Sequence, residues 1–230
     1  MPSVKTMSTI LRAKLFIYNG QGMEPWIKQD YAHALDMSAF VKLNDNKHEN
    51  EDGHHHGKSD PHYWLDVDNM VLMTQAIQKK LNKLFPEYKS LINKNAQAYV
   101  ENLSLLEIEY AQELQVCKKD EIVVNHNAFG YLASHYKFDV HSLTGLSPDE
   151  QVSAKNMKEM TDLVKEENIN TIFFESFVSD KLAQGISKET GAKVESLQPL
   201  ANVTEEEAKK GYILIMQENL KKLSYAMECE

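Results

Sequence analysis

The sequence predicts an α/β fold of two lobes of parallel sheet flanked by helices, joined by one long spanning helix. Short apolar strands alternate with amphipathic helices through residues 118–230, which is typical of a parallel sheet covered on both faces. Before them, apolar residues recur at helical spacing over residues 88–116, a length of ~40 Å at ~1.5 Å per residue. We therefore expect an N-terminal lobe over 1–86, a spanning helix over 87–117 and a C-terminal lobe over 118–230.

The N-terminal lobe is predicted to open with a helix over residues 7–15, which Ser3 or Thr6 could cap. A short strand follows at 15–18, and the glycines after it predict a turn. We expect a helix over 23–34, because a proline in the first turn is tolerated, and a strand over 36–43.

Two helices with apolar stripes come next. The first begins near Asp66 or Asp68, either of which can cap it, and its apolar side chains recur in steps of three and four residues (Met70, Met73, Ile77, Leu81 and Leu84). Pro86 interrupts the pattern, and the helix over 88–116 then repeats it. Methionines and aromatic residues on such stripes are interpreted as core.

The C-terminal lobe is predicted from four strands that alternate with four helices. The strands are expected at 121–125, 138–143, 170–174 and 193–197, and the helices at 128–136, 149–167, 178–190 and 204–227. A ligand site in such a sheet lies at the carboxyl ends of its strands.

Composition excludes several classes of function. The 230-residue chain has a net charge of −9 with its basic residues interspersed among acidic ones, which argues against binding to nucleic-acid phosphates. No apolar run approaches the ~20 residues of a membrane span, and no signal peptide opens the chain. The two cysteines, Cys117 and Cys229, form no CxxC pair, so we expect neither a disulfide framework nor a thiolate zinc site.

The region around residues 44–62 carries the strongest chemical signal. Histidines concentrate there among Gly, Asp and Ser residues that disfavour regular structure (His48, His54, His55, His56 and His62). An internal, mixed cluster differs from an expression tag, although a polar solvated loop remains an alternative for the three consecutive histidines. His62 stands apart because Pro61 restricts the backbone before it.

Two further residues follow apolar strands of the C-terminal lobe. His126 comes directly after one strand, where it could be a metal ligand or a polar residue at a helix start. Glu175 holds the equivalent place after another strand, where it could complete a site or cap the next helix. His135 and His141 are interpreted as surface or structural residues. Phosphate-loop, GxSxG and HExxH signatures are missing, so the sequence gives little support for an enzyme.

Several motifs together resemble one known family. They are the segment from Asp60 to Asp66 (DPHYWLD) after a histidine-rich loop, the segment beginning at Asn125 (NHNAFGYL), and Gly145-Leu146-Ser147-Pro148. They are similar to the metal-specific solute-binding proteins of bacterial ABC importers, and within these to the zinc branch of the ZnuA and AdcA type.

The resemblance implies a receptor without catalytic activity that binds one Zn²⁺ and passes it to a membrane ABC permease outside the cytoplasm. His62 and His126 would each supply a ring nitrogen to the metal at ~2.0 to 2.1 Å. The loop over about 44–59, with His48 and His54–His56, would be an accessory metal-binding element. Imidazole ligands also favour zinc over manganese, which prefers carboxylate and water.

The chain departs from the family pattern in two places. A further ligand histidine would precede Pro2, so we expect an incomplete N-terminal lobe lacking a signal peptide and lipid-anchor cysteine, with an exposed sheet edge open to self-association. Ala201 stands near the position of an acidic ligand.

These departures keep two alternatives open. One is a zinc buffer or a non-functional truncated remnant that binds metal only through the histidine-rich loop. The other is a zinc hydrolase with Glu175 as the general base, which no further signature supports.

Overall fold

The computed structural model describes residues 2–28, 31–44, 59–146, 152–175 and 180–230. The chain divides into two compact units, Met1–Glu101 (unit 1) and Asn102–Glu230 (unit 2), and the boundary falls within one long helix. The mixed α/β architecture with parallel sheets, flanking helices and a long helix agrees with the fold class predicted from the sequence.

Unit 1 begins with α1 (Val4–Arg12), which starts where the Ser3 side chain accepts a hydrogen bond from the Thr6 backbone N–H. Strands β1 (Phe16–Tyr18) and β2 (Ala34–Asp36) then pair in parallel as a two-stranded sheet. The 3₁₀ turn Met37–Phe40 follows β2 directly, because the Asp36 side chain accepts from the Ser38 backbone N–H and ends the strand.

Two expectations for unit 1 were therefore wrong. The described residues between 23 and 34 form turns rather than a helix, and the strand expected over 36–43 lies at β2 instead. The Glu24 side chain accepts hydrogen bonds from the backbone N–H groups of Asn19 and Gly20, which fixes a turn where the pattern suggested a helix start. Gly20 has φ +77°, and a Cβ there would lie 2.2 Å from a carboxylate oxygen of Asp36.

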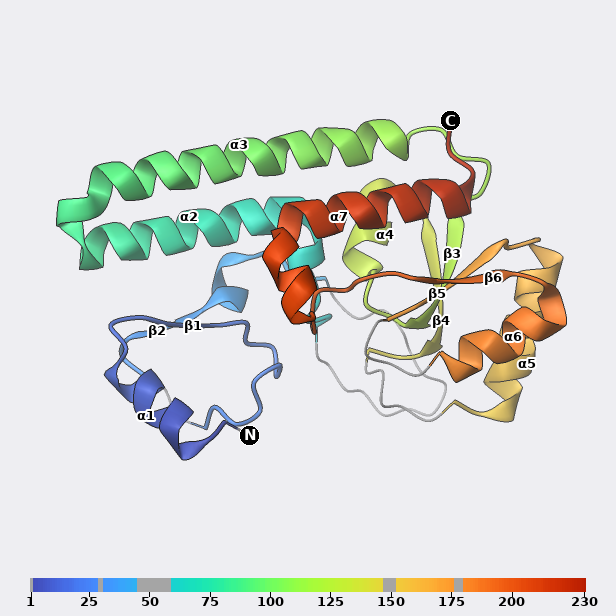
Figure 1. Ribbon diagram of the computed structural model, residues 1–230, viewed down its shortest axis with the longest axis horizontal. Coiled ribbons are helices and arrows are strands. Elements are labelled where there is room, and N and C mark those ends of the chain that lie inside the picture. The colour runs from blue at the N-terminus through green and yellow to red at the C-terminus, as the bar shows by residue number, and fades with distance from the viewer. Residues whose placement is uncertain (1, 29–30, 45–58, 147–151, 176–179) are drawn as a thin grey trace. The chain divides into compact units, whose positions relative to one another are not determined.

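The two apolar stripes form α2 (Val67–Leu84) and α3 (Lys89–Glu113), separated by the 3₁₀ turn Pro86–Tyr88. Of the two residues expected to cap this helix, Asp66 and Asp68, it is Asp66 that caps α2. Within unit 1, α2 runs antiparallel to the start of α3, and Asn93 accepts hydrogen bonds from the side-chain amides of Gln78 and Asn82 (Figure 1).

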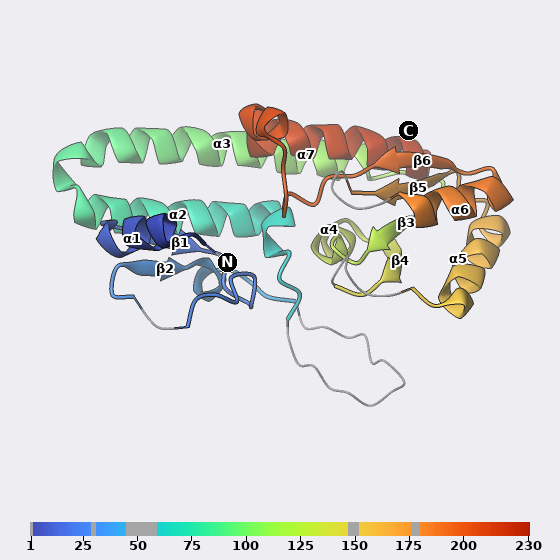
Figure 2. The ribbon, with the colours of Figure 1, turned by 60° about the horizontal axis from the view of Figure 1, so that its bottom comes forward.

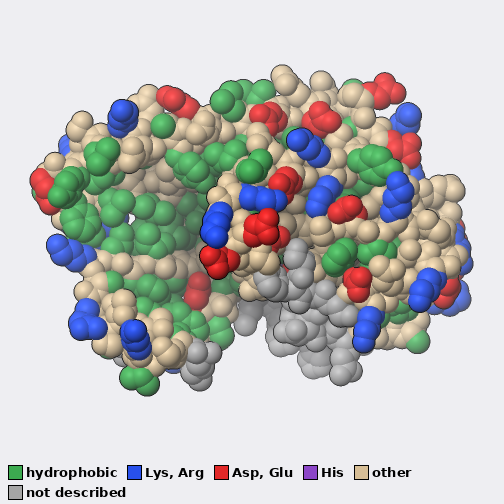
Figure 3. All heavy atoms as spheres, in the orientation of Figure 1, with side chains coloured by type: hydrophobic (Ala, Val, Ile, Leu, Met, Phe, Trp, Pro, Cys, Tyr) green, Lys and Arg blue, Asp and Glu red, His purple; other side chains and the backbone are tan. Residues whose placement is uncertain are grey.

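The apolar stripe of α2 is only partly covered within unit 1. Its large hydrophobic side chains from Met70 to Leu84 are half-buried, whereas Val67 is buried. On the face drawn in Figure 3, hydrophobic side chains gather over the α2 region of unit 1. Unit 1 therefore has a partly exposed apolar face, formed by the α2 stripe, in addition to its two-stranded sheet.

Unit 2 is built on a four-stranded parallel sheet of order β4-β3-β5-β6. The strands are β3 (Glu121–His126), β4 (Asp139–Thr144), β5 (Thr171–Phe174) and β6 (Lys193–Ser196), and the helices that alternate with them are α4 (Gly130–Tyr136), α5 (Ala154–Glu166), α6 (Lys181–Thr190) and α7 (Glu205–Met227). The alternation predicted from the sequence is confirmed, and the observed bounds coincide with the expected ones or differ by five residues at most.

Helices cover both faces of this sheet, as the continuous apolar character of its strands requires. Val123, Leu143 and Ile172 pack with side chains of α5 and α6 in one buried cluster. The neighbouring side chains Ile122 and Val124 are also buried and alternate with Val123 along β3. Figure 2 shows α5 and α6 side by side next to the strands, with α7 on the other side of the sheet.

Helix α7 closes unit 2. A capping box between Thr204 and Glu207 starts it, and Gly211, with φ 77° and ψ 170°, introduces a kink. Within unit 2, the buried Tyr110 of α3 donates a 2.7 Å hydrogen bond to the carbonyl of Met216 in α7. Burial raises the pKa of Tyr110 well above its ordinary value of 10.0, and the neighbouring Tyr136 raises it further.

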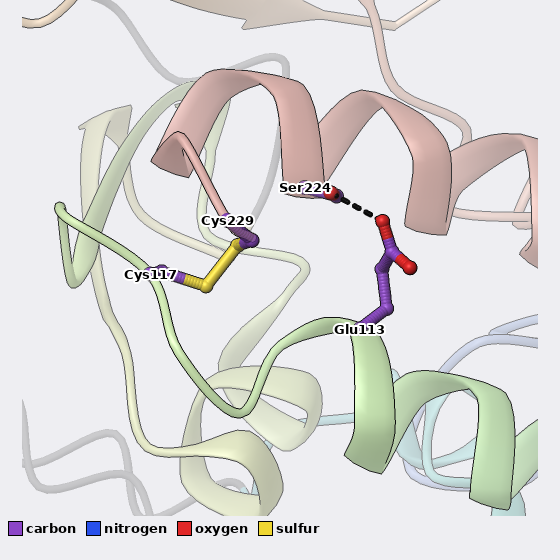
Figure 4. Close-up of a disulfide and its surroundings, with 4 residues drawn as sticks. All are labelled: Glu113, Cys117, Ser224 and Cys229. Atoms are coloured by element: carbon purple, nitrogen blue, oxygen red, sulfur yellow. Dashed lines mark hydrogen bonds between the residues drawn. A yellow bond between two sulfur atoms is a disulfide. The ribbon is translucent and has the colours of Figure 1, made fainter.

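The two cysteines form a disulfide, contrary to the sequence-based expectation. Cys117 follows α3 and Cys229 follows α7, and the two residues also form an antiparallel backbone bridge (Figure 4). Their sequence separation of 112 residues carries no local signal, so only the fold brings them together.

Among the residues that the structure describes, no helix has both the length and the apolar character needed to cross a bilayer.

We expect Tyr110→Phe to lower the free energy of unfolding by about 1–2 kcal/mol, because a buried carbonyl loses its donor. Above pH ~10, Tyr110 ionises in the unfolded chain but not in the folded chain, so the wild type loses stability. The difference in free energy of unfolding between the wild type and Tyr110→Phe therefore narrows. Urea unfolding at pH 7 and pH 10.5 measures both effects. The exposed Tyr88→Phe is the control, and an equal effect at this position would contradict the assignment.

Candidate metal centre

His62 is held rigidly by the short segment in which it lies. The Asp60 carboxylate accepts a 2.9 Å hydrogen bond from the His62 backbone N–H, and the same oxygen lies 2.8 Å from His62 Nδ1. Both side chains are buried, with His62 only 3% exposed. A carboxylate on Nδ1 selects the tautomer with its proton on that nitrogen and its lone pair on Nε2.

The residues after His62 lock this arrangement into unit 1. The Trp64 ring meets the His62 ring edge-on at 5.4 Å, and the Tyr63 hydroxyl donates a 2.6 Å hydrogen bond to the Asn19 carbonyl. The Asn69 side-chain amide, from α2, donates to the Tyr63 carbonyl. His62 is therefore attached to a packed part of unit 1 on both its ring and its backbone.

The histidine-rich loop joins unit 1 beside His62. His48, His54, His55 and His56 lie outside the described residues. The described residues on either side of the segment are joined, because the Asp60 backbone N–H donates to the Asn44 carbonyl at 3.3 Å. The loop therefore begins next to the residue that contacts His62 Nδ1, and it returns to that residue.

His126 is the last residue of β3, in the centre of the sheet of unit 2. β3 pairs in parallel with β4 on one side and β5 on the other, so the carboxyl ends of β3 and β5 are neighbours. Glu175 follows β5 directly, and its carboxylate lies in close contact with His126 Nδ1. His126 is 2% exposed and Glu175 is 7% exposed.

Asn125 completes the hydrogen bonding of this carboxylate. Its side-chain amide donates to Glu175 Oε1 at 3.2 Å, and its backbone carbonyl accepts from the Thr144 hydroxyl of β4 at 3.1 Å. Asn125 thus positions the Glu175 carboxylate that contacts His126 Nδ1, and Thr144 joins the Asn125 backbone to β4. As with His62, this contact favours the tautomer whose Nε2 lone pair can bind a metal.

The geometry excludes one of the two roles that the sequence left open for Glu175. It does not cap the next helix, because α6 begins at Lys181 with Asp180 at its N-cap. Its carboxylate lies against His126 Nδ1 instead, which is the position of an orienting group. Sequence reasoning missed the same role for Asp60, although an aspartate two residues before a histidine is the local signal of such a contact.

The remaining histidines that the structure describes have structural contacts. His33 Nε2 lies 2.9 Å from the Ile10 carbonyl, His135 pairs with Glu107, and His141 pairs with Glu121. Ala201, near the expected acidic position, is exposed.

The chain matches known zinc-uptake proteins along nearly its whole length. Residues 1–226 match the ZnuA family, described as the periplasmic component A of a zinc-uptake complex. The zinc-binding lipoprotein AdcA of Streptococcus pneumoniae serotype 4 is 35% identical over 247 residues, covering 100% of this chain and 49% of AdcA. The high-affinity zinc uptake protein ZnuA of Bacillus subtilis is 33% identical over 234 residues, covering 95% of this chain and 73% of that protein. The chain thus spans about half the length of the AdcA relatives.

Solved structures of similar proteins superpose on this chain over nearly its whole length. The zinc-bound ZnuA-like domain of S. pneumoniae AdcA superposes with a TM-score of 0.80 at 33% identity, covering 99% of this chain and 85% of that one. The laminin-binding protein Lmb of Streptococcus agalactiae, described as an adhesin with metal-transporting activity, gives a TM-score of 0.83 at 31% identity over 99% of this chain and 85% of that one.

The two carboxylate contacts predict the ring tautomers of the metal-free protein. We expect ¹⁵N-resolved NMR at pH 8 to show His62 and His126 with the proton on Nδ1. Asp60→Asn and Glu175→Gln should each change the tautomer of only its own histidine, because an amide can accept or donate at that position. Glu121→Gln, beside His141, is the control, and an Nε2–H tautomer in the wild type would contradict the geometry.

Proposed function

This chain belongs to the ZnuA family of zinc-uptake components, and on that premise we propose that it is an extracytoplasmic receptor that binds Zn²⁺ and delivers it to an ABC permease. The observation that carries the proposal is the repeated pairing of a buried histidine with a buried carboxylate, Asp60 on His62 and Glu175 on His126. Metal-binding histidines commonly contact a carboxylate through their second ring nitrogen.

The chemistry of these two pairs suits zinc. Each pair would offer Nε2 of a neutral imidazole, a ligand that Zn²⁺ binds at ~2.0 to 2.1 Å. The carboxylate on Nδ1 fixes the orientation of the ring and so removes rotational freedom that metal binding would otherwise have to restrict. Manganese is a poorer fit, because it prefers carboxylate and water ligands.

The histidine-rich loop over about 44–59 is proposed as an accessory element. The hydrogen bond between Asp60 and Asn44 supports this role, because it joins the described residues that flank the segment, and Asp60 also contacts His62 Nδ1. Zinc held loosely by His48 or His54–His56 would then be released close to the tighter ligand. A buffer that binds zinc only through this loop is the competing function.

The compartment and the partner follow from the family. AdcA is named a lipoprotein and the family component is periplasmic, so we propose that this chain also works outside the cytoplasm. The Cys117–Cys229 disulfide supports this location, because disulfides persist in oxidising compartments. The proposed partner is a membrane ABC permease, and the proposed role is binding and transfer without a catalysed reaction.

We expect the double variant His62→Ala/His126→Ala to lose the tight zinc site. The loss in affinity should exceed about 100-fold, because removing an orienting partner alone costs about 10- to 100-fold. Zinc titration against a competing chelator measures it. Asp60→Asn and Glu175→Gln should give losses within that smaller range.

Two controls separate the receptor from the buffer. His141→Ala, on the partly exposed pair with Glu121, should leave zinc affinity unchanged. Deleting residues 48–58 should remove weak additional zinc and keep the tight site. Binding that disappears with the loop and survives in the double variant would instead show a buffer.

The apolar face of unit 1 is the proposed site of self-association. Among the described residues, β1 and β2 pair only with each other, and the α2 stripe stays half-buried. We expect sedimentation velocity to show a dimer whose population rises with concentration. Ile17→Lys in β1 (40% exposed) should weaken it, whereas Ile108→Lys in α3 (47% exposed) should not. A monomer at every concentration would refute this assignment.

A further inference from the structure

The disulfide joins the two ends of unit 2. Cys117 lies between α3 and β3, and Cys229 lies two residues beyond α7 (Figure 4). Backbone hydrogen bonds continue the connection on both sides, from Lys119 N–H to the Met227 carbonyl and from Glu230 N–H to the Val116 carbonyl, each at 3.0 Å. The C-terminal end of the chain is thereby paired with the segment that leads into the sheet.

The covalent ring closed by this bond contains the whole sheet. Its two cysteines are 112 positions apart in the sequence, so the ring includes all four strands of unit 2 and helices α4 to α7. A cross-link over so long a loop restricts the unfolded chain strongly, and in the chain-entropy account this stabilises the folded state. The stability of unit 2 should therefore depend on this one bond.

The non-covalent contacts at the same end of unit 2 are modest. The Ser224 hydroxyl donates a 2.6 Å hydrogen bond to Glu113, and Asn170 donates to the Glu228 carboxylate at 3.2 Å (Figure 4 shows the first). The ion pair between Lys119 and Glu228, at 3.6 Å, is partly exposed and contributes little. Without the disulfide, the end of α7 would be held by these contacts, by the short backbone bridge, by the hydrogen bond from Lys193 to the Tyr225 hydroxyl, and by the burial of Leu223 and Met227.

A cavity gives reagents a route to the bond. It has a volume of about 460 Å³ and is lined by Cys117 together with Leu114 and Met227 as apolar walls. Lys119 and Lys137 line it alongside the acidic Glu107 and Asp120. Because Cys117 lines this cavity, an incoming thiolate, the species that attacks sulfur, would approach the disulfide from the Cys117 side.

The bond is also remote from the candidate metal ligand of unit 2. Cys117 precedes the amino end of β3, whereas His126 is at its carboxyl end, five residues after Glu121. At ~3.3 Å per residue, the strand alone separates the two edges of the sheet by about 16 Å. Glu175 and Asn125 lie at the same edge as His126.

We propose that the Cys117–Cys229 disulfide is a redox-sensitive clasp: a dithiol reductant opens it at the Cys117 sulfur, which loosens the end of α7 and leaves the His126 and Glu175 pair in place. The incoming thiolate forms a mixed disulfide with Cys117 and expels Cys229 as a thiolate. The second thiol of the reductant then releases Cys117. The reductant is oxidised to its own disulfide by two electrons, and its two protons end on the two cysteine thiols.

The test uses the intact 230-residue chain and dithiothreitol as the reductant. We expect native protein to incorporate two alkyl groups from iodoacetamide after reduction and none before it, by intact mass. Reduction should lower the melting temperature of unit 2 by about 10 °C or more, given the size of the closed loop. Cys117→Ser/Cys229→Ser should melt at the reduced value and gain no further response to dithiothreitol.

Zinc binding is measured on the double serine variant, because dithiothreitol itself binds zinc. Its affinity should stay within about threefold of the wild type. Ser224→Ala, which keeps the disulfide, should still respond to reduction. Alkylation that requires denaturant, an unchanged melting temperature or a lost zinc site would each overturn the proposal. Alkylation and melting need no zinc, so they test the clasp even if the proposed receptor function fails.

Discussion

The contact between a buried carboxylate and Nδ1 of a buried histidine is the interaction on which the candidate site depends. An imidazole that can rotate or change tautomer presents either nitrogen, and it loses that freedom when a metal binds. Asp60 and Glu175 remove this freedom in advance for His62 and His126. The pairing also provides each buried polar group with a partner, which a low-dielectric interior requires.

The two pairs are supported by different kinds of structure. Asp60 and His62 lie within one short turn, so a backbone hydrogen bond and a ring contact share the same carboxylate oxygen. Glu175 and His126 come from adjacent parallel strands whose carboxyl ends must meet at one edge. The Asp60–His62 contact therefore depends on the local geometry of a turn, whereas the Glu175–His126 contact depends on the register of the strands. Both supports restrict the histidine ring through hydrogen bonds or strand pairing, which suits the proposed metal site.

Within unit 2, the contacts of the candidate metal ligand and the disulfide lie at opposite edges of the sheet. The edge of the sheet that carries His126 is fixed by side-chain hydrogen bonds among Asn125, Thr144 and Glu175. The opposite edge is joined by the disulfide and a short backbone bridge to the end of α7. The disulfide and the candidate metal ligand of unit 2 therefore lie at opposite edges of the sheet.

The sequence by itself determined the parallel α/β sheet of unit 2, the long helix and the two candidate histidines, because apolar periodicity and local motifs record these features directly. It failed for the segment between residues 23 and 34, where the Glu24 side chain and the Gly20 backbone form a turn that periodicity does not detect. Only the tertiary structure decided that Glu175 contacts His126 and that Cys117 bonds to Cys229. The two residues of each contact are 49 and 112 positions apart in the sequence. Strand order and helix packing, rather than local propensity, bring such distant residues together.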